Sequence, residues 1–124
     1  MTKPKNSHVW VIDDDLAILE ATQAILIEEG YDVQTINDPT HIKAHIAEGK
    51  LPQLIYLDIL MSGVDGRDVA QILKSHKKTA NVPIVMLSAN MRIEEIAKQA
   101  NVDGFLKKPF DIEDLIYLTK KFVS

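Results

Sequence analysis

The chain has 124 residues, of which 46% are hydrophobic and 26% are charged, proportions typical of one folded globular domain rather than of a disordered chain. The net charge of −4 offers no basic surface to nucleic acid, and the absence of cysteine excludes disulfides, thiolate metal sites and a cysteine nucleophile. No apolar run approaches the ~20 residues of a membrane span, so we expect a cytoplasmic protein that does not engage a membrane. We expect residues 1–7 to form a flexible tail and residues 8–124 to form the domain.

In the first half of the chain, two strand patterns each precede a helix pattern. Residues 9–12 are continuously apolar, which is typical of a strand buried on both faces of a parallel sheet, whereas residues 31–36 alternate with polar residues and predict an edge strand. A first helix is predicted over residues 16–29, with an inward stripe of Ile18, Ala21 and Ile25. A shorter second helix is predicted from Asp38, its N-cap, to Gly49.

The second half repeats this alternation three times. Residues 54–57 and 82–87 are again continuous apolar runs, and residues 104–107 form a shorter strand candidate. The helices that follow these strands have apolar residues at helical spacing, and they are predicted after Gly66, over residues 93–100 and from Asp111 onward. The inward stripe of the last helix is predicted to be Ile112, Leu115, Ile116, Thr119 and Phe122.

Five strands that are each followed by a helix predict an α/β fold, a doubly wound five-stranded parallel sheet with helices on both faces. With the second strand at an edge, we expect the flavodoxin-like strand order 2-1-3-4-5. In such sheets ligands bind at the carboxyl ends of the strands, near the switch point between strands one and three.

Polar residues end four of the predicted strands, at one edge of the sheet. They are Asp13 and Asp14 after the first strand, Asp58 after the third, Ser88 after the fourth and Lys108 after the fifth. An acidic helix start stabilised by the helix dipole would explain Asp13 and Asp14, but not the side chains on the other strands. A carboxylate that attacks a phosphoryl group needs cations and donors in place for the developing charge, and a small acidic crevice suits Mg²⁺.

Through these residues the chain resembles the receiver domains of two-component response regulators, from His8 to Phe122. The matching motifs are Val11-Ile12-Asp13-Asp14-Asp15, Leu57-Asp58-Ile59, Met61-Ser62-Gly63-Val64-Asp65-Gly66, Leu87-Ser88-Ala89 and Lys107-Lys108-Pro109-Phe110. Three positions depart from the usual pattern: Ser62 stands where the family usually has proline, Ser88 is the less common hydroxyl residue, and Phe105 replaces a frequent tyrosine.

The resemblance implies that Asp58 accepts a phosphoryl group from a histidine kinase or a histidine phosphotransfer protein. It implies that Asp13, Asp14, Asp58 and the backbone carbonyl of Leu60 hold Mg²⁺, or Mn²⁺ in its place. Lys108 and Ser88 would contact the phosphoryl group, and a cis Lys108–Pro109 bond would aim the lysine.

The resemblance further implies a signalling switch that turns over no external substrate. Ser88 and Phe105 would couple phosphorylation to a change in the surface of the fourth helix, fifth strand and fifth helix. A downstream protein, which the sequence does not identify, would read that surface.

Two other functions use similar residues. A metal-dependent phosphohydrolase would use Asp58 or Asp13 as a turnover nucleophile, but the chain has no cap domain and no evident general acid two residues after a strand-ending aspartate. Steady hydrolysis of an added phosphoester would favour it. A flavodoxin-like cofactor binder would need a hydroxyl-rich phosphate loop where this chain has three aspartates, and a colourless protein would exclude it.

Overall fold

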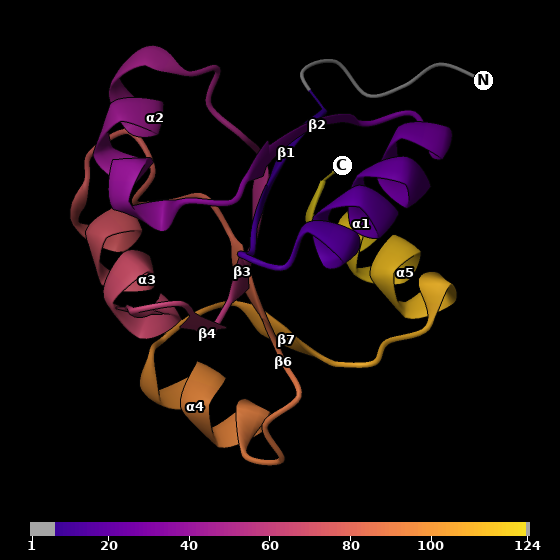
Figure 1. The fold of residues 1–124 in the computed structure, drawn as a ribbon. Coiled ribbons are helices and arrows are strands. Elements are labelled where there is room, and N and C mark those ends of the chain that lie inside the picture. The colour runs from indigo at the N-terminus through magenta and orange to yellow at the C-terminus, as the bar shows by residue number, and fades with distance from the viewer. Residues whose placement is uncertain (1–6, 124) are drawn as a thin grey trace.

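Five parallel strands make up the central sheet of the computed structural model, which describes residues 7–123 (Figure 1). They are β1 (His8–Ile12), β2 (Asp32–Ile36), β3 (Leu54–Asp58), β6 (Ile84–Ser88) and β7 (Gly104–Lys107). Their order is β2-β1-β3-β6-β7, which agrees with the predicted order 2-1-3-4-5. The sequence did not predict a small antiparallel hairpin, made by β4 (Leu60–Met61) and β5 (Val64–Asp65).

The helices lie in two groups on opposite sides of this sheet (Figure 1). One group consists of α1 (Leu16–Glu28) and α5 (Ile112–Phe122), and the other of α2 (Ile42–Glu48), α3 (Gly66–Ser75) and α4 (Ile93–Gln99). A 3-10 turn, η1 (Pro39–His41), precedes α2 and is capped by Asp38. Because the sheet is covered on both sides, β1, β3 and β6 are buried along their whole length, as their apolar runs predict.

The N-terminal tail expected over residues 1–7 lies outside the described residues, except for Ser7. Ser7 is buried, and its carbonyl accepts a hydrogen bond from the amide of Asp32. Among the helices within residues 7–123, none is long and apolar enough to cross a membrane.

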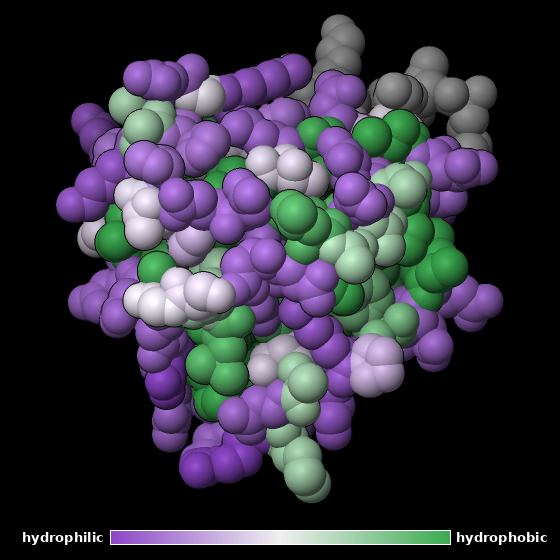
Figure 2. Space-filling model, viewed as in Figure 1, coloured by the Kyte–Doolittle hydropathy of each residue, from purple (hydrophilic) through white to green (hydrophobic). Residues whose placement is uncertain are grey.

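The predicted inward stripe of α1 is wrong by one residue. The buried residues of this helix are Leu19, Thr22 and Leu26 rather than Ile18, Ala21 and Ile25. Apolar residues surround most of α1, so their spacing does not select one face, and Leu16 and Ile27 remain exposed. Apolar side chains therefore gather on the surface over α1 and α5 (Figure 2).

In α5, Leu115 and Thr119 are buried as predicted, but Ile112 at the first position is 56% exposed. A hydrogen-bond network ties this helix to the central strand β3. The hydroxyl of Tyr56 lies 2.6 Å from Thr119 Oγ1 and donates to the carbonyl of Leu115 at 3.2 Å. The network satisfies a phenol hydroxyl that would otherwise be buried without a partner.

Gly66, the first residue of α3, touches the backbone that carries Asp58. A Cβ atom at Gly66 would collide with the carbonyl oxygen of Asp58 and would lie 2.7 Å from the Cα of Ile59. The close approach lets the amide of Gly66 donate to the carbonyl of Ile59. Glycine at this position therefore helps to fix the end of β3.

We predict that Gly66→Ala lowers the free energy of unfolding by about 3 kcal/mol, because backbone atoms cannot move aside as a flexible side chain can. Gly63→Ala is the matched control: Gly63 has φ of 72° but no atom within 4 Å of the added Cβ, so only the backbone strain of about 1 kcal/mol should appear. Urea unfolding of both variants measures the difference. Equal losses in the two variants would contradict the proposed collision.

Candidate functional site

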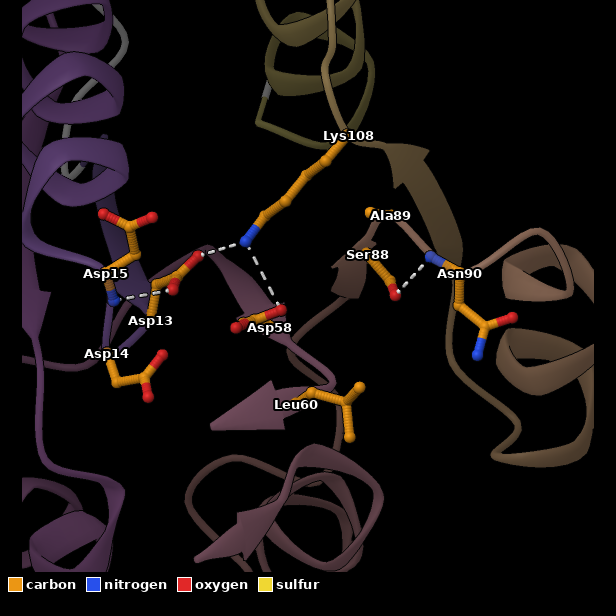
Figure 3. Close-up of a pocket in the computed structure, with 9 residues that line it drawn as sticks. All are labelled: Asp13, Asp14, Asp15, Asp58, Leu60, Ser88, Ala89, Asn90 and Lys108. Atoms are coloured by element: carbon orange, nitrogen blue, oxygen red, sulfur yellow. Dashed lines mark hydrogen bonds and ion pairs between the residues drawn. The ribbon is translucent and has the colours of Figure 1, made fainter. Parts of the chain in front are cut away.

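The polar residues that end the strands line one cavity of about 390 Å³ (Figure 3). Its walls include Asp13 and Asp14 after β1, Asp58 at the end of β3, Ser88 at the end of β6 and Lys108 after β7. The parallel register produces this convergence, because Asp58 lies opposite Leu87 and Ser88 lies opposite Lys107. The structure thus brings together the strand-end residues that the sequence singled out.

Lys108 lies between two buried carboxylates. Its Nζ is 2.8 Å from Oδ2 of Asp13 and 3.4 Å from Oδ1 of Asp58. The backbone helps to place it there, since the amide of Lys108 donates to the carbonyl of Ser88. The Lys108–Pro109 bond is cis, as the family resemblance suggests. Lys107, one residue earlier, is exposed, as the alternation of a strand requires.

Each acidic residue after β1 has a different role in the local structure. Asp13 is fully buried, and its Oδ1 accepts a hydrogen bond from the amide of Asp15. Asp15 caps α1 by accepting from the amides of Ala17 and Ile18. Asp14 accepts two hydrogen bonds from Ser62 in the β4–β5 hairpin. The sequence alone did not predict a role for Ser62, which stands where the family usually has proline.

The surroundings of these groups shift their proton affinities. Burial, together with the negative charge of Asp13, raises the pKa of Asp58 to about 6, although Lys108 opposes the shift. Burial would lower the pKa of Lys108, but the hydrogen bond and charge of Asp13 and the charge of Asp58 outweigh it, so the pKa is raised. At neutral pH Asp58 is therefore a carboxylate that can act as a nucleophile, and Lys108 is a cation.

On the other wall of the cavity, the Ser88 hydroxyl accepts a hydrogen bond from the amide of Asn90 at 3.0 Å. Leu60 lies at the mouth with its side chain exposed, on β4 of the hairpin. Phe105 lies outside the cavity, on β7, and its side chain is 38% exposed. Asn90 also accepts from the amide of Arg92, so the hydroxyl of Ser88 is linked by hydrogen bonds to the residue that precedes α4.

The donor set fits a hard divalent cation. Asp13, Asp14 and Asp58 each offer a carboxylate oxygen, and these oxygens lie within 4.8 Å of one another. Oxygen ligands at the edge of an open cavity suit Mg²⁺, which keeps several of its waters, whereas zinc prefers histidine or cysteine. The backbone carbonyl of Leu60 stays a predicted fourth ligand.

Comparison with known proteins gives consistent matches along nearly the whole chain. A family model described as the response regulator receiver domain matches residues 9–120. The chain is 36% identical over 111 residues to the DNA-binding dual master transcriptional regulator RpaA of Synechocystis sp., in an alignment that covers 88% of this chain and 46% of RpaA. The chain thus spans about half the length of curated relatives such as RpaA.

Solved structures show the same fold. A putative response regulator from Chloroflexus aurantiacus matches with a TM-score of 0.87 at 26% identity, over 98% of each chain. The receiver domain of NtrX from Brucella abortus matches with a TM-score of 0.82 at 29% identity, over 93% of this chain and 97% of that domain.

We predict a pH dependence from the raised pKa of Asp58. The folded protein holds this proton more tightly than the unfolded chain, so the associated stability is present below about pH 4 and is lost as pH rises through about 6. Asp58→Asn cannot ionise, so in EDTA its stability relative to wild type should increase by about 1–3 kcal/mol between pH 4 and pH 7. Urea unfolding at the two pH values measures this change. If the stability difference between Asp58→Asn and wild type stays constant or decreases from pH 4 to pH 7, ionisation of Asp58 does not destabilise the folded protein.

Proposed function

The chain belongs to the response regulator receiver domain family of two-component signalling proteins, and on that premise we propose that Asp58 accepts the phosphoryl group of a phosphohistidine donor. The observation that carries this proposal is the environment of Asp58. It is a buried carboxylate at the end of a central strand, with Asp13 on one side and the ammonium of Lys108 within 3.4 Å.

The residues of the site suit an in-line transfer. A carboxylate oxygen of Asp58 forms a bond to phosphorus while the P–N bond of the donor breaks, and the imidazole leaves with the bonding electron pair and regains a proton from water. The equatorial phosphoryl oxygens gain negative charge, which Lys108 meets with its ammonium and Ser88 with its hydroxyl. A Mg²⁺ ion held by Asp13, Asp14, Asp58 and the Leu60 carbonyl would supply further positive charge to the same oxygens.

The donor would be a histidine kinase or a histidine phosphotransfer protein, and the chemistry would take place on this chain alone, with no external substrate turned over. RpaA is described as a DNA-binding regulator. The net charge of −4 on this chain, however, gives nucleic acid no basic surface to bind. We therefore propose that the domain, residues 8–124, passes its signal to a protein surface and not directly to nucleic acid.

The hydrogen bonds at Ser88 suggest how phosphorylation changes that surface. Ser88 ends β6, and the Asn90 backbone bonded to its hydroxyl leads into α4. If the hydroxyl turns to a phosphoryl oxygen, the loop before α4 moves inward, and Phe105 on the neighbouring strand can turn into the space that is vacated. The surface proposed to change consists of α4, β7 and α5.

One prediction tests whether Asp58 is the phosphoryl acceptor. A small acyl phosphate should modify the wild-type protein in the presence of Mg²⁺ or Mn²⁺, but not in EDTA, and Asp58→Asn should abolish the modification. Asp111→Asn removes an exposed carboxylate outside the cavity and should be modified like wild type. Intact-mass spectrometry detects the added phosphate. Equal uptake by Asp58→Asn, or by wild type in EDTA, would refute the assignment.

Another prediction separates the phosphorylation of Asp58 from the conformational change that is proposed to follow it. Ser88→Ala keeps the nucleophile and the lysine, so it should still be phosphorylated, but it loses the hydroxyl that reads the phosphate. NMR spectra with a beryllofluoride mimic should show shift changes from Ser88 to Gln99 and around Phe105 in wild type, and much smaller changes in the variant. Full wild-type changes in Ser88→Ala would show that another residue couples the site to the surface.

A further inference from the structure

The β4–β5 hairpin reaches across to the acidic end of β1 through one residue, Ser62. The amide of Ser62 donates to Oδ2 of Asp14 at 2.7 Å, and its hydroxyl lies 2.9 Å from the same oxygen. Within residues 7–123, no other residue donates a hydrogen bond to this carboxylate. Both contacts join segments 48 residues apart in the chain, so they depend on the tertiary structure.

The three carboxylates of the cavity are fixed by different donors. Asp13 is held by the amide of Asp15 and by Lys108, and Asp58 by Lys108. Asp14 is more exposed than either, so its side chain would have more rotational freedom without Ser62. Because both donors of Ser62 converge on Oδ2, the orientation of the carboxylate is set while Oδ1 stays available.

We propose that Ser62 is a positioning residue for cation binding, which holds Asp14 ready to ligate the divalent ion through Oδ1. The inference rests on the proposed function, in which Asp14 is a ligand. Hydrogen bonds to a ligating carboxylate reduce the entropy lost when the ion binds, and their removal weakens the affinity for the metal. Ser62 therefore contributes to the affinity without touching the ion.

The hairpin loop allows a clean test. Ser62 and Gly63 form a two-residue loop between the paired residues Met61 and Val64, and only Gly63 of the two has a positive φ, at 72°. These features indicate a type II turn, in which proline is well accommodated at the position of Ser62. Ser62→Pro thus removes both donors with the turn intact, Ser62→Ala removes only the hydroxyl, and Ser62→Thr keeps both.

Titration of the metal-free proteins with Mg²⁺, followed by the NMR shift of the Asp15 amide, measures the affinity directly. We expect the dissociation constant to rise about threefold in Ser62→Ala and about tenfold in Ser62→Pro, and to stay near wild type in Ser62→Thr. Ser75→Ala, which removes another exposed hydroxyl with one hydrogen bond, is the matched control and should bind like wild type. Unchanged or tighter binding in Ser62→Ala and Ser62→Pro overturns the proposal.

The same titration in an Asp14→Asn background separates this proposal from the one on which it rests. There, Ser62→Pro should add no further loss, because Ser62 acts through Asp14. A further loss in that background would show a general effect on the fold and would also overturn the positioning role. If Asp14→Asn weakens binding but Ser62→Pro does not, only the role of Ser62 fails. If wild type binds no Mg²⁺, or if Asp14→Asn binds as wild type does, the proposed metal site fails as well.

Discussion

The ammonium of Lys108 lies between two carboxylates that the fold has removed from water, 2.8 Å from Asp13 and 3.4 Å from Asp58. Two like charges so close in a buried place would be strongly destabilising without a counter-charge. The whole site depends on this ammonium, because it permits Asp58 to be buried and yet ionised at neutral pH. The sheet supplies the geometry, since the backbone of Lys108 is bonded to that of Ser88 at the end of the neighbouring strand.

The acidic residues of the cavity differ in the groups that they contact. Asp13 accepts hydrogen bonds from Lys108 and from the amide of Asp15, the residue that caps α1. Asp14 is instead held by the uncharged amide and hydroxyl of Ser62 in the hairpin. A cation that enters the cavity therefore meets three different carboxylates. Asp13 is paired with the lysine, Asp58 is strained by burial, and Asp14 is oriented by hydrogen bonds. The three positions are chemically distinct although the residue type is the same.

The sequence predicted the parts of this structure that follow from strong local patterns. Continuous apolar runs located the central strands, and the polar residues after them converge because parallel strands end at the same edge. The buried face of α1 was not predictable, because apolar residues surround that helix, and the exposure of Ile112 reflects its place at the helix start. The contact of Ser62 with Asp14 joins residues 48 apart through a hairpin of two-residue strands, which is too short to leave a periodic pattern.

The link between Tyr56 and α5 bears on how a partner would read the domain. Tyr56 belongs to the same strand as Asp58, and its hydroxyl anchors α5 to the sheet through Leu115 and Thr119. Helix α4 has seven residues and packs on the sheet through apolar contacts. In the proposed switch α4 therefore moves relative to α5, which changes the surface that α4, β7 and α5 form together. A partner that contacts both helices would distinguish the two signalling states by the angle between the helices. A partner that contacts α5 alone would bind both states equally.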